Sequence, residues 1–135
     1  AGVFDLFHIG HLNMFKRAKE QCRYLIVGVV SDEGVRLNKQ AEPFVPFDER
    51  IEMVRSCKYV DEAIKLPLDF CGTRDMFKIY HFDVQFSGSD YEHDPAWLAE
   101  KEFLEKNGST MVFFPYTQST SSTKLKKAIE NRINN

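Results

Sequence analysis

The sequence lacks the patterns that mark several large classes of protein. Its three cysteines, Cys22, Cys57 and Cys71, are odd in number and widely spaced, which fits neither a disulfide framework nor a zinc site with close ligand pairs. No run approaches the roughly 20 apolar residues that span a bilayer, and nothing at the start resembles a cleavable signal. We therefore predict reduced, mostly buried thiols in a cytoplasmic protein that makes no membrane contact.

A strong net charge is also missing. Lysine and arginine number 18 and aspartate and glutamate 20, so the formal net charge is −2, with the two signs interleaved. No basic face is large enough to predict nucleic acid as the main partner. The Walker-type loop and the GxGxxG pattern are absent too, which removes the usual support for kinases, GTPases and NAD-dependent dehydrogenases. Small anionic ligands remain compatible with this charge balance.

The apolar content suffices for one compact domain covering residues 1–135. Hydrophobic residues make up 43% of the chain and include 12 phenylalanines, which is ample for a core without metals or disulfides. No internal repeat, low-complexity segment or linker interrupts the sequence. A single domain is the prediction.

Apolar runs alternate with helical patterns along this domain. We expect strands at residues 1–4 (as the end of a strand), 24–31, 62–66, 83–88 and 110–115. We expect helices at residues 11–21, 48–58, 73–80, 95–106 and 121–132, a helix start at 31–33, and a mobile loop with two prolines at 38–46. The alternation predicts an α/β fold: a single Rossmann-like doubly wound domain with a five-stranded parallel sheet. Ligands of such folds bind beyond the carboxyl ends of the strands.

The motif His8-Ile9-Gly10-His11 lies between the first expected strand and the first expected helix. Gly10 lets a phosphate approach the backbone, and a helix start offers free N–H groups with partial positive charge. Two imidazoles there can donate hydrogen bonds to a phosphate under attack. The structural alternative is a turn residue at His8 and a capping or core residue at His11; the place after a strand end favours phosphate chemistry.

Hydroxyl side chains gather where the last expected helix begins. Ser119 to Ser122 stand in a row and Thr123 follows. N-capping needs only one such side chain, whereas an anion-binding helix start uses several hydroxyls with the free N–H groups. Both alternatives stay open from this segment alone. In the expected topology the two helix starts would face each other and form a phosphate clamp.

Four charged residues are further candidates. Lys39 lies in the expected loop and could close over phosphates, and Asp90 follows a strand end on the ligand side. Arg50 and Lys58 flank one helix and could bind an acceptor phosphate. A solvated loop lysine, a turn aspartate and ordinary surface charge are the respective alternatives.

The ordered set of motifs resembles the cytidylyltransferase family, most closely its glycerol-3-phosphate cytidylyltransferases. The matching segments are GVFDLFHIGH, RLNKQAEPFVPFDER, KYVDEAI, SGSDY and TQSTSSTKLKKAI, between residues 2 and 129. The resemblance implies three groups of site residues: catalytic His8, His11 and Lys39; nucleotide-binding Gly2, Val3, Phe4, Gly10, Asp90, Thr117, Ser121, Ser122 and Thr123; and acceptor-binding Asp5, Arg50 and Lys58. It implies no protein ligand for a metal.

The sequence departs from the family pattern at four positions. Tyr116 stands where the terminal motif usually has arginine, Val3 replaces a threonine, Lys58 an arginine and Ser119 a glycine. Replacing arginine by lysine loses bidentate phosphate recognition. These departures affect the choice of substrate more than the choice of reaction.

The resemblance implies a Mg²⁺-dependent transfer of CMP from CTP to a small alcohol phosphate, most simply glycerol 3-phosphate, by a homodimer. Two alternatives remain. One is an adenylyltransferase of the same superfamily, because the segment STSST at residues 119–123 also suits the terminal motif of those enzymes. The other is a non-catalytic domain that senses a nucleotide, which Tyr116 in place of an arginine makes worth testing. The sequence does not identify the acceptor.

Overall fold

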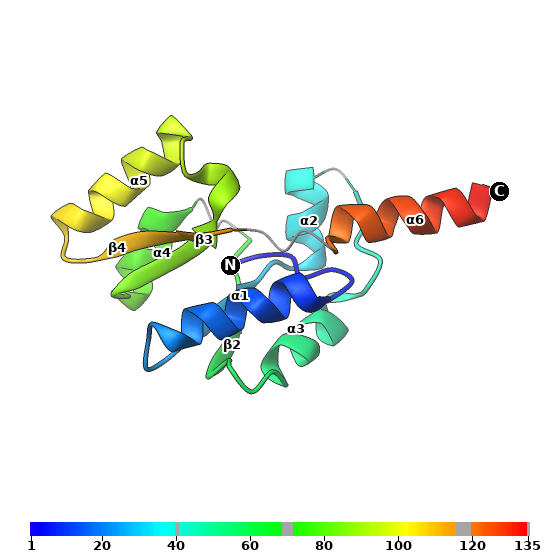
Figure 1. Cartoon of the computed structure of the whole chain (residues 1–135), viewed down its shortest axis with the longest axis horizontal. Coiled ribbons are helices and arrows are strands. Elements are labelled where there is room, and N and C mark those ends of the chain that lie inside the picture. The colour runs from blue at the N-terminus through cyan, green and yellow to red at the C-terminus, as the bar shows by residue number, and fades with distance from the viewer. Residues whose placement is uncertain (40, 69–71, 116–119, 135) are drawn as a thin grey trace. The chain divides into compact units, whose positions relative to one another are not determined.

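The computed structural model describes residues 1–39, 41–68, 72–115 and 120–134 (Figure 1), apart from the side chain of Lys39. The chain divides into two compact units, residues 1–68 with 117–135 and residues 69–116. The single domain expected from the sequence stays a prediction.

The first unit is built on two parallel strands. β1 (Ile26–Val29) pairs in parallel with β2 (Glu62–Lys65). Gly2 adds one parallel bridge to Val29, with its N–H donating to the carbonyl of Gly28 at 2.9 Å. The chain leaves the sheet directly afterwards, because Phe4 adopts the left-handed conformation at φ 57°. The first expected strand is thus reduced to a single bridge.

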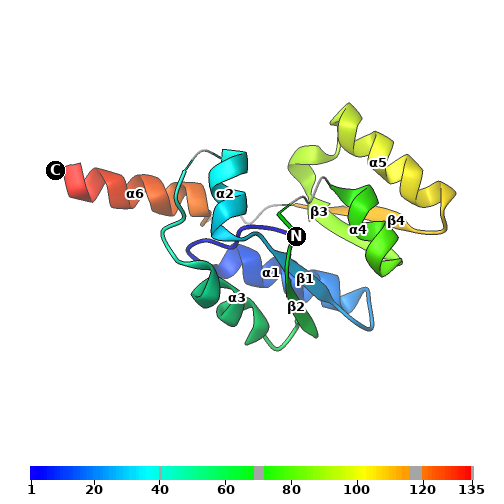
Figure 2. The same cartoon turned by 180° about the vertical axis from the view of Figure 1, so that it is seen from behind.

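The described residues of this unit form four helices: α1 (Ile9–Glu20), α2 (Asp32–Lys39), α3 (Phe47–Arg55) and α6 (Ser122–Asn134). α3 packs on both strands (Figure 2). The core collects buried side chains from α1, β1, α2 and α3, namely Phe15, Ala18, Val27, Val29, Val35, Ile51 and Val54. The apolar run predicted as a buried parallel strand is confirmed.

One boundary in this unit differs from the expectation. Lys39 is the last residue of α2 and does not lie in the loop expected at 38–46. The acids Asp32 and Glu33 occupy the first turn of α2, where they favour the helix, and the prolines that break helices come only at Pro43 and Pro46. The helix therefore continues two residues into the segment expected to be a loop.

The second unit pairs β3 (Val84–Gly88) in parallel with β4 (Thr110–Phe114). Its helices are α4 (Thr73–Tyr80), the short 3₁₀ turn η1 (Ser89–Tyr91) and α5 (Pro95–Lys106). The carboxylate of Asp94 caps α5 by accepting the N–H of Ala96 at 2.9 Å. The predicted cap, the proline at the first helical position and the end of the helix at Lys106 are all confirmed.

The α/β fold with parallel strands is confirmed, whereas the single five-stranded sheet is not. The described strands form two separate two-stranded sheets, one in each unit, and Gly2 contributes only a bridge. None of the described helices is long and apolar enough to cross a membrane. Cys22 and Cys57 are free thiols that are only partly buried, and Cys71 lies outside the described residues.

Candidate functional site

The two histidines of the HxGH motif hold the start of α1. His8 is the N-cap with an extended backbone, and its Nδ1 accepts the N–H of Gly10 at 3.0 Å. His11 reaches back, and its Nδ1 accepts the N–H of His8 at 3.2 Å. The two rings lie 3.9 Å apart between centroids. This reciprocal arrangement is a capping box made of imidazoles.

The capping bonds determine which ring nitrogen carries the proton. A neutral imidazole has one N–H donor and one acceptor nitrogen. Because Nδ1 accepts a backbone N–H in both His8 and His11, the proton of each neutral ring is on Nε2. Each ring is therefore a donor at its Nε2 atom. Capping and phosphate recognition, the two interpretations left open by the sequence, use different nitrogens.

Both rings are neutral near pH 7. Burial, and then the charge of neighbouring His8, lower the pKa of His11 to about 4. Burial also lowers the pKa of His8. The aromatic rings of Phe4 and Phe7 supply part of this apolar environment, with centroids 5.3 Å and 5.2 Å from that of His11. The pair is therefore suited to donate hydrogen bonds rather than to carry positive charge.

Gly10 is required by a close approach at this corner. A Cβ atom on Gly10 would lie 2.7 Å from Cε1 of His8 and 3.5 Å from the carbonyl oxygen of Thr120. The first distance is shorter than a van der Waals contact, so a side chain here would displace the ring. The second distance shows that the residues before α6 lie next to the start of α1.

The start of α6 joins this corner through its serines. The hydroxyl of Ser121 accepts the N–H of Lys124 at 3.1 Å and so caps the helix. The hydroxyl of Ser122 donates to the backbone carbonyl of Asp5 at 2.7 Å. Thr123 is exposed in the first turn. The structure thus brings two helix N-termini together, as the topology predicted, while Thr117 and Tyr116 lie outside the described residues.

Asp5 is a buried carboxylate that joins three segments. It is 2% exposed and accepts the N–H groups of Phe44 at 2.8 Å and Val45 at 3.0 Å. Lys126 of α6 lies 3.1 Å from the same carboxylate. Burial alone would raise the pKa of Asp5, but these hydrogen bonds and the lysine charge lower it overall. Asp5 is thus occupied inside the protein, and contact with an acceptor would require these bonds to open.

Arg50 is also buried, with 1% exposure. Its guanidinium donates to the carbonyls of Val45 at 2.8 Å, Val3 at 2.7 Å and Val30 at 2.8 Å. The fourth bond runs to the carboxylate of Asp32 at 2.6 Å. Arg50 therefore ties the segment before α3 to the residues that follow Gly2 and β1. The contact with an acceptor phosphate expected from the sequence would need this network to open.

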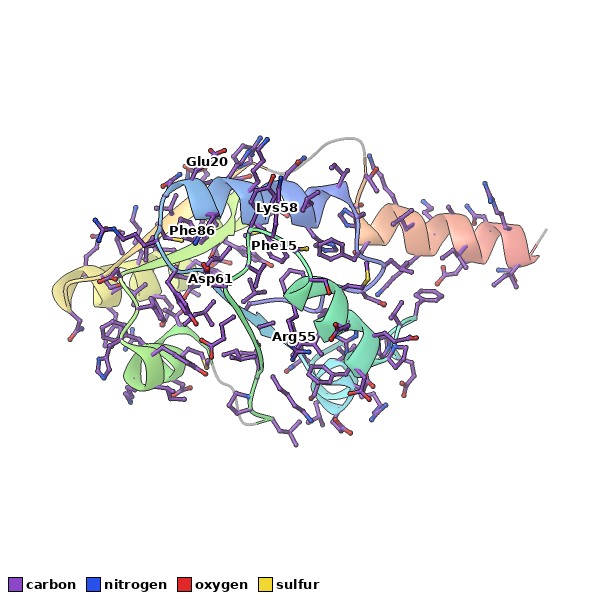
Figure 3. All side chains as sticks on the ribbon, turned by 90° about the horizontal axis from the view of Figure 1, so that it is seen from below. Phe15, Glu20, Arg55, Lys58, Asp61 and Phe86 are labelled. Atoms are coloured by element: carbon purple, nitrogen blue, oxygen red, sulfur yellow. The ribbon has the colours of Figure 1, made fainter. Side chains whose placement is uncertain are left out.

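Lys58 lies away from the HxGH corner. Lys58 is exposed in the turn between α3 and β2 (Figure 3). Its Nζ lies 5.2 Å from the ring centroid of Tyr59. That turn precedes the amino end of β2, and the neighbouring Asp61 pairs there with Lys19 at 2.6 Å. His8 comes after Gly2 in the chain, so it lies beyond the carboxyl end of the parallel bridge that Gly2 forms. Because the strands are parallel, the structure does not bring Lys58 to the corner.

Two other predicted residues are placed only in part, and three are placed fully. Asp90 is exposed in η1, directly after β3, and is described within the second unit alone. Lys39 ends α2, but its side chain lies outside the described part. Gly2, Val3 and Phe4 lead into the corner: Gly2 forms the sheet bridge, Val3 accepts from Arg50, and Phe4 packs on His11.

Sequence reasoning missed two residues of this site, Asp32 and Lys126. Asp32 follows a strand end, which is the same signal that identified Asp90, and could have been found in this way. Lys126 has no such signal, because its partner Asp5 is 121 positions away and the pairing depends on the docking of α6. In the part of the chain that the structure describes, no cluster of three or more His, Cys, Asp or Glu could hold a metal ion.

Comparison with known proteins places the chain in a family. The cytidylyltransferase-like family model matches residues 1–128. The chain is 37% identical to FAD synthase of Thermococcus kodakarensis, with 98% of this chain and 88% of that protein covered. It is 32% identical to glycerol-3-phosphate cytidylyltransferase of Bacillus subtilis, with 95% and 92% covered.

Two further matches extend the comparison. Ethanolamine-phosphate cytidylyltransferase of Dictyostelium discoideum is 41% identical over 98% of this chain, which spans 37% of that longer protein. A crystal structure of the lipopolysaccharide core biosynthesis protein of Thermoplasma volcanium superposes with a TM-score of 0.68 at 26% identity, covering 88% of this chain and 93% of that one. The chain therefore belongs to the cytidylyltransferase-like family of nucleotidyltransferases.

Proposed function

We propose that this enzyme transfers CMP from CTP to a small alcohol phosphate, with glycerol 3-phosphate as the first candidate, and releases pyrophosphate. The observation that supports this most is the pair of neutral histidines, His8 and His11, whose Nε2 atoms carry the protons beside two helix starts. The family match and the resemblance to a glycerol-3-phosphate cytidylyltransferase support the substrates.

The proposed chemistry needs no protein nucleophile. A phosphate oxygen of the acceptor attacks the α-phosphorus of CTP in line; the new P–O bond forms as the bond to the β-phosphate bridging oxygen breaks, and pyrophosphate leaves with that electron pair. The Nε2–H groups of His8 and His11 donate to the α-phosphate oxygens, where negative charge grows. The starts of α1 and α6 add N–H groups and partial positive charge for the remaining phosphates.

Mg²⁺ is part of the proposal as an ion that arrives with the nucleotide. We propose that this ion is bound mainly through the substrate phosphates and water. When bound, Mg²⁺ would supply charge neutralisation of the triphosphate. The protein's own residues, Ser121 to Thr123 and the α6 start, would hold the phosphates in place.

A second candidate is an adenylyltransferase that forms FAD. It is favoured by the 37% identity to a FAD synthase of which the chain covers 88%, a more complete match than that to the ethanolamine-phosphate enzyme. Both candidates use the same corner and differ in nucleotide and acceptor. The nucleotide-sensing domain considered from the sequence differs from both, because it would bind without turnover.

Pyrophosphate release with Mg²⁺ separates these proposals. CTP and ATP are each tested with glycerol 3-phosphate, ethanolamine phosphate, choline phosphate and FMN. We expect acceptor-dependent release with CTP; release with ATP and FMN alone would replace the proposal by the second candidate. A folded His11→Ala variant should lose turnover by about 10²–10³-fold, and retained activity would contradict the role of the histidine. Tight CTP binding without release favours a sensor.

Assembly and location belong to the proposal as well. We propose a homodimer, as expected from the family resemblance, and a cytoplasmic location, as predicted from the sequence. Sedimentation at micromolar protein concentration measures the mass of the assembly directly, and a monomer would contradict the expected dimer.

A further inference from the structure

The last helix, α6, is held by its first turns. None of its described side chains is fully buried. Ser122 donates to the Asp5 carbonyl at 2.7 Å, and Lys126 pairs with the Asp5 carboxylate at 3.1 Å. Leu125 lines an apolar cavity of about 350 Å³. The rest of α6 extends away from the other helices of its unit in both views (Figures 1 and 2).

Asp5, to which α6 is attached, lies in a segment with an unusual backbone conformation. Asp5 is buried between Phe4 and Leu6, which both have left-handed backbone conformations at φ 57° and 51°. Such conformations are unfavourable for residues other than glycine and persist only where the surroundings enforce them. Since Asp5 stands three positions before His8, a helix bound to Asp5 is placed relative to the HxGH corner.

We infer that Lys126 is a positioning residue of the nucleotide site, which fixes the start of α6 against the HxGH corner through its ion pair with Asp5. The inference rests on the proposed function, because the α6 start is taken to hold the phosphates. Lys126 lies at the second turn of α6, one turn after Ser122. Its ammonium also lies 5.7 Å from the ring centroid of Phe44, the residue whose N–H binds Asp5.

Charge balance separates this role from direct phosphate binding. The Asp5 carboxylate already neutralises Lys126, so this lysine offers little net charge to a triphosphate. The carboxylate is 2% exposed, whereas the lysine side chain is 32% exposed. Removing the lysine therefore leaves a buried negative charge short of one partner, and the attachment of α6 weakens. Nucleotide binding then weakens, because the hydroxyl and N–H groups that bind the phosphates are no longer held in place.

Lys126→Met tests the inference, because methionine keeps the unbranched stem over Phe44 and removes the charge. Lys127→Met is the matched control, as this exposed lysine is the next residue of the same helix. With the nucleotide that the wild type uses, we expect Lys126→Met to raise KM about tenfold with kcat within threefold. Lys126→Arg should restore KM to within threefold, and Lys127→Met should match the wild type. A raised KM with unchanged kcat indicates that binding is weakened equally in the ground state and the transition state.

A double-mutant cycle with Asp5→Asn shows whether the pair acts as a unit. Both single variants should raise KM, and the double variant should be no worse than the more severe single one by more than about twofold. Additive effects would show that Lys126 acts apart from Asp5 and would overturn the inference.

Hydrogen exchange of the α6 amides gives a readout that needs no nucleotide. We expect faster exchange in Lys126→Met than in Lys127→Met at Lys124 and Leu125, whose N–H groups bind Ser121, and at the helix amides that follow. Unchanged exchange, or unchanged KM in an active enzyme, would overturn the inference alone. A wild type that turns over no nucleotide while α6 still loosens in Lys126→Met would instead overturn the proposed function.

Discussion

Substituting Gly10 by alanine should inactivate this enzyme while leaving it folded. A Cβ atom there would lie 2.7 Å from Cε1 and 3.0 Å from Nδ1 of His8. These atoms belong to a side chain that can rotate, so the ring moves and the backbone stays. The substitution therefore acts on the placement of one imidazole.

The effect on stability should be small because two terms oppose each other. Displacing His8 loses its cap to the Gly10 N–H, which costs about 0.5–2 kcal/mol. Alanine within the first turn of α1 recovers about 0.5–1 kcal/mol relative to glycine. The net change in the free energy of unfolding should stay within about 1 kcal/mol.

The effect on turnover should be much larger. A shift of about 1 Å in a catalytic group can cost about 10²-fold in rate, equivalent to about 3 kcal/mol. Denaturant unfolding and pyrophosphate release, measured on the same preparation, separate the two effects. Lys16→Ala, on the exposed face of α1, controls for an alanine substitution elsewhere in the same helix. Turnover of Gly10→Ala within threefold of the wild type would refute the reasoning about His8.

Two further predictions concern stability. Between pH 6.5 and pH 4 the unfolded chain binds a proton at His11 that the folded protein excludes, because burial holds the pKa of His11 at about 4. Stability should therefore fall by up to about 3 kcal/mol as the pH is lowered through this window, at about 1.4 kcal/mol per pKa unit. Denaturant unfolding of the wild type and His11→Gln checks this, and an identical pH dependence would contradict it. Arg50→Met should cost about 3–5 kcal/mol, since it leaves three carbonyls and the Asp32 carboxylate without this donor; a loss below 1 kcal/mol by the same assay would contradict the buried network.

Local elements could be predicted from the sequence, because their signals are local. Asp94 and Pro95 fix the start of α5, and the apolar run around Val27 and Val29 identifies a strand buried on both faces. The number of strands in one sheet could not be predicted in this way. It depends on whether separate apolar runs pair, and at Gly2 the left-handed turn that follows limits pairing to one bridge.

Charged residues were harder to interpret than the motif they accompany. Arg50 and Lys58 look equivalent in sequence, since both are basic and flank one helix. The structure buries Arg50 against three backbone carbonyls and leaves Lys58 exposed before β2. Strand direction separates residues before a strand from residues after it, and would have placed Lys58 at the edge away from His8. Burial of an arginine depends on carbonyls brought together by the fold, which no local pattern reveals.

The histidines show why a structural and a catalytic interpretation of the same residues need not compete. A cap on Nδ1 is a purely structural bond, and it would form in a protein without any activity. By occupying Nδ1, however, it leaves the proton on Nε2 and fixes the plane of each ring. Burial then keeps His11 neutral at physiological pH, so this donor is present without a change of protonation. The bonds that begin α1 are thus the same bonds that prepare His8 and His11 to stabilise a phosphate under attack.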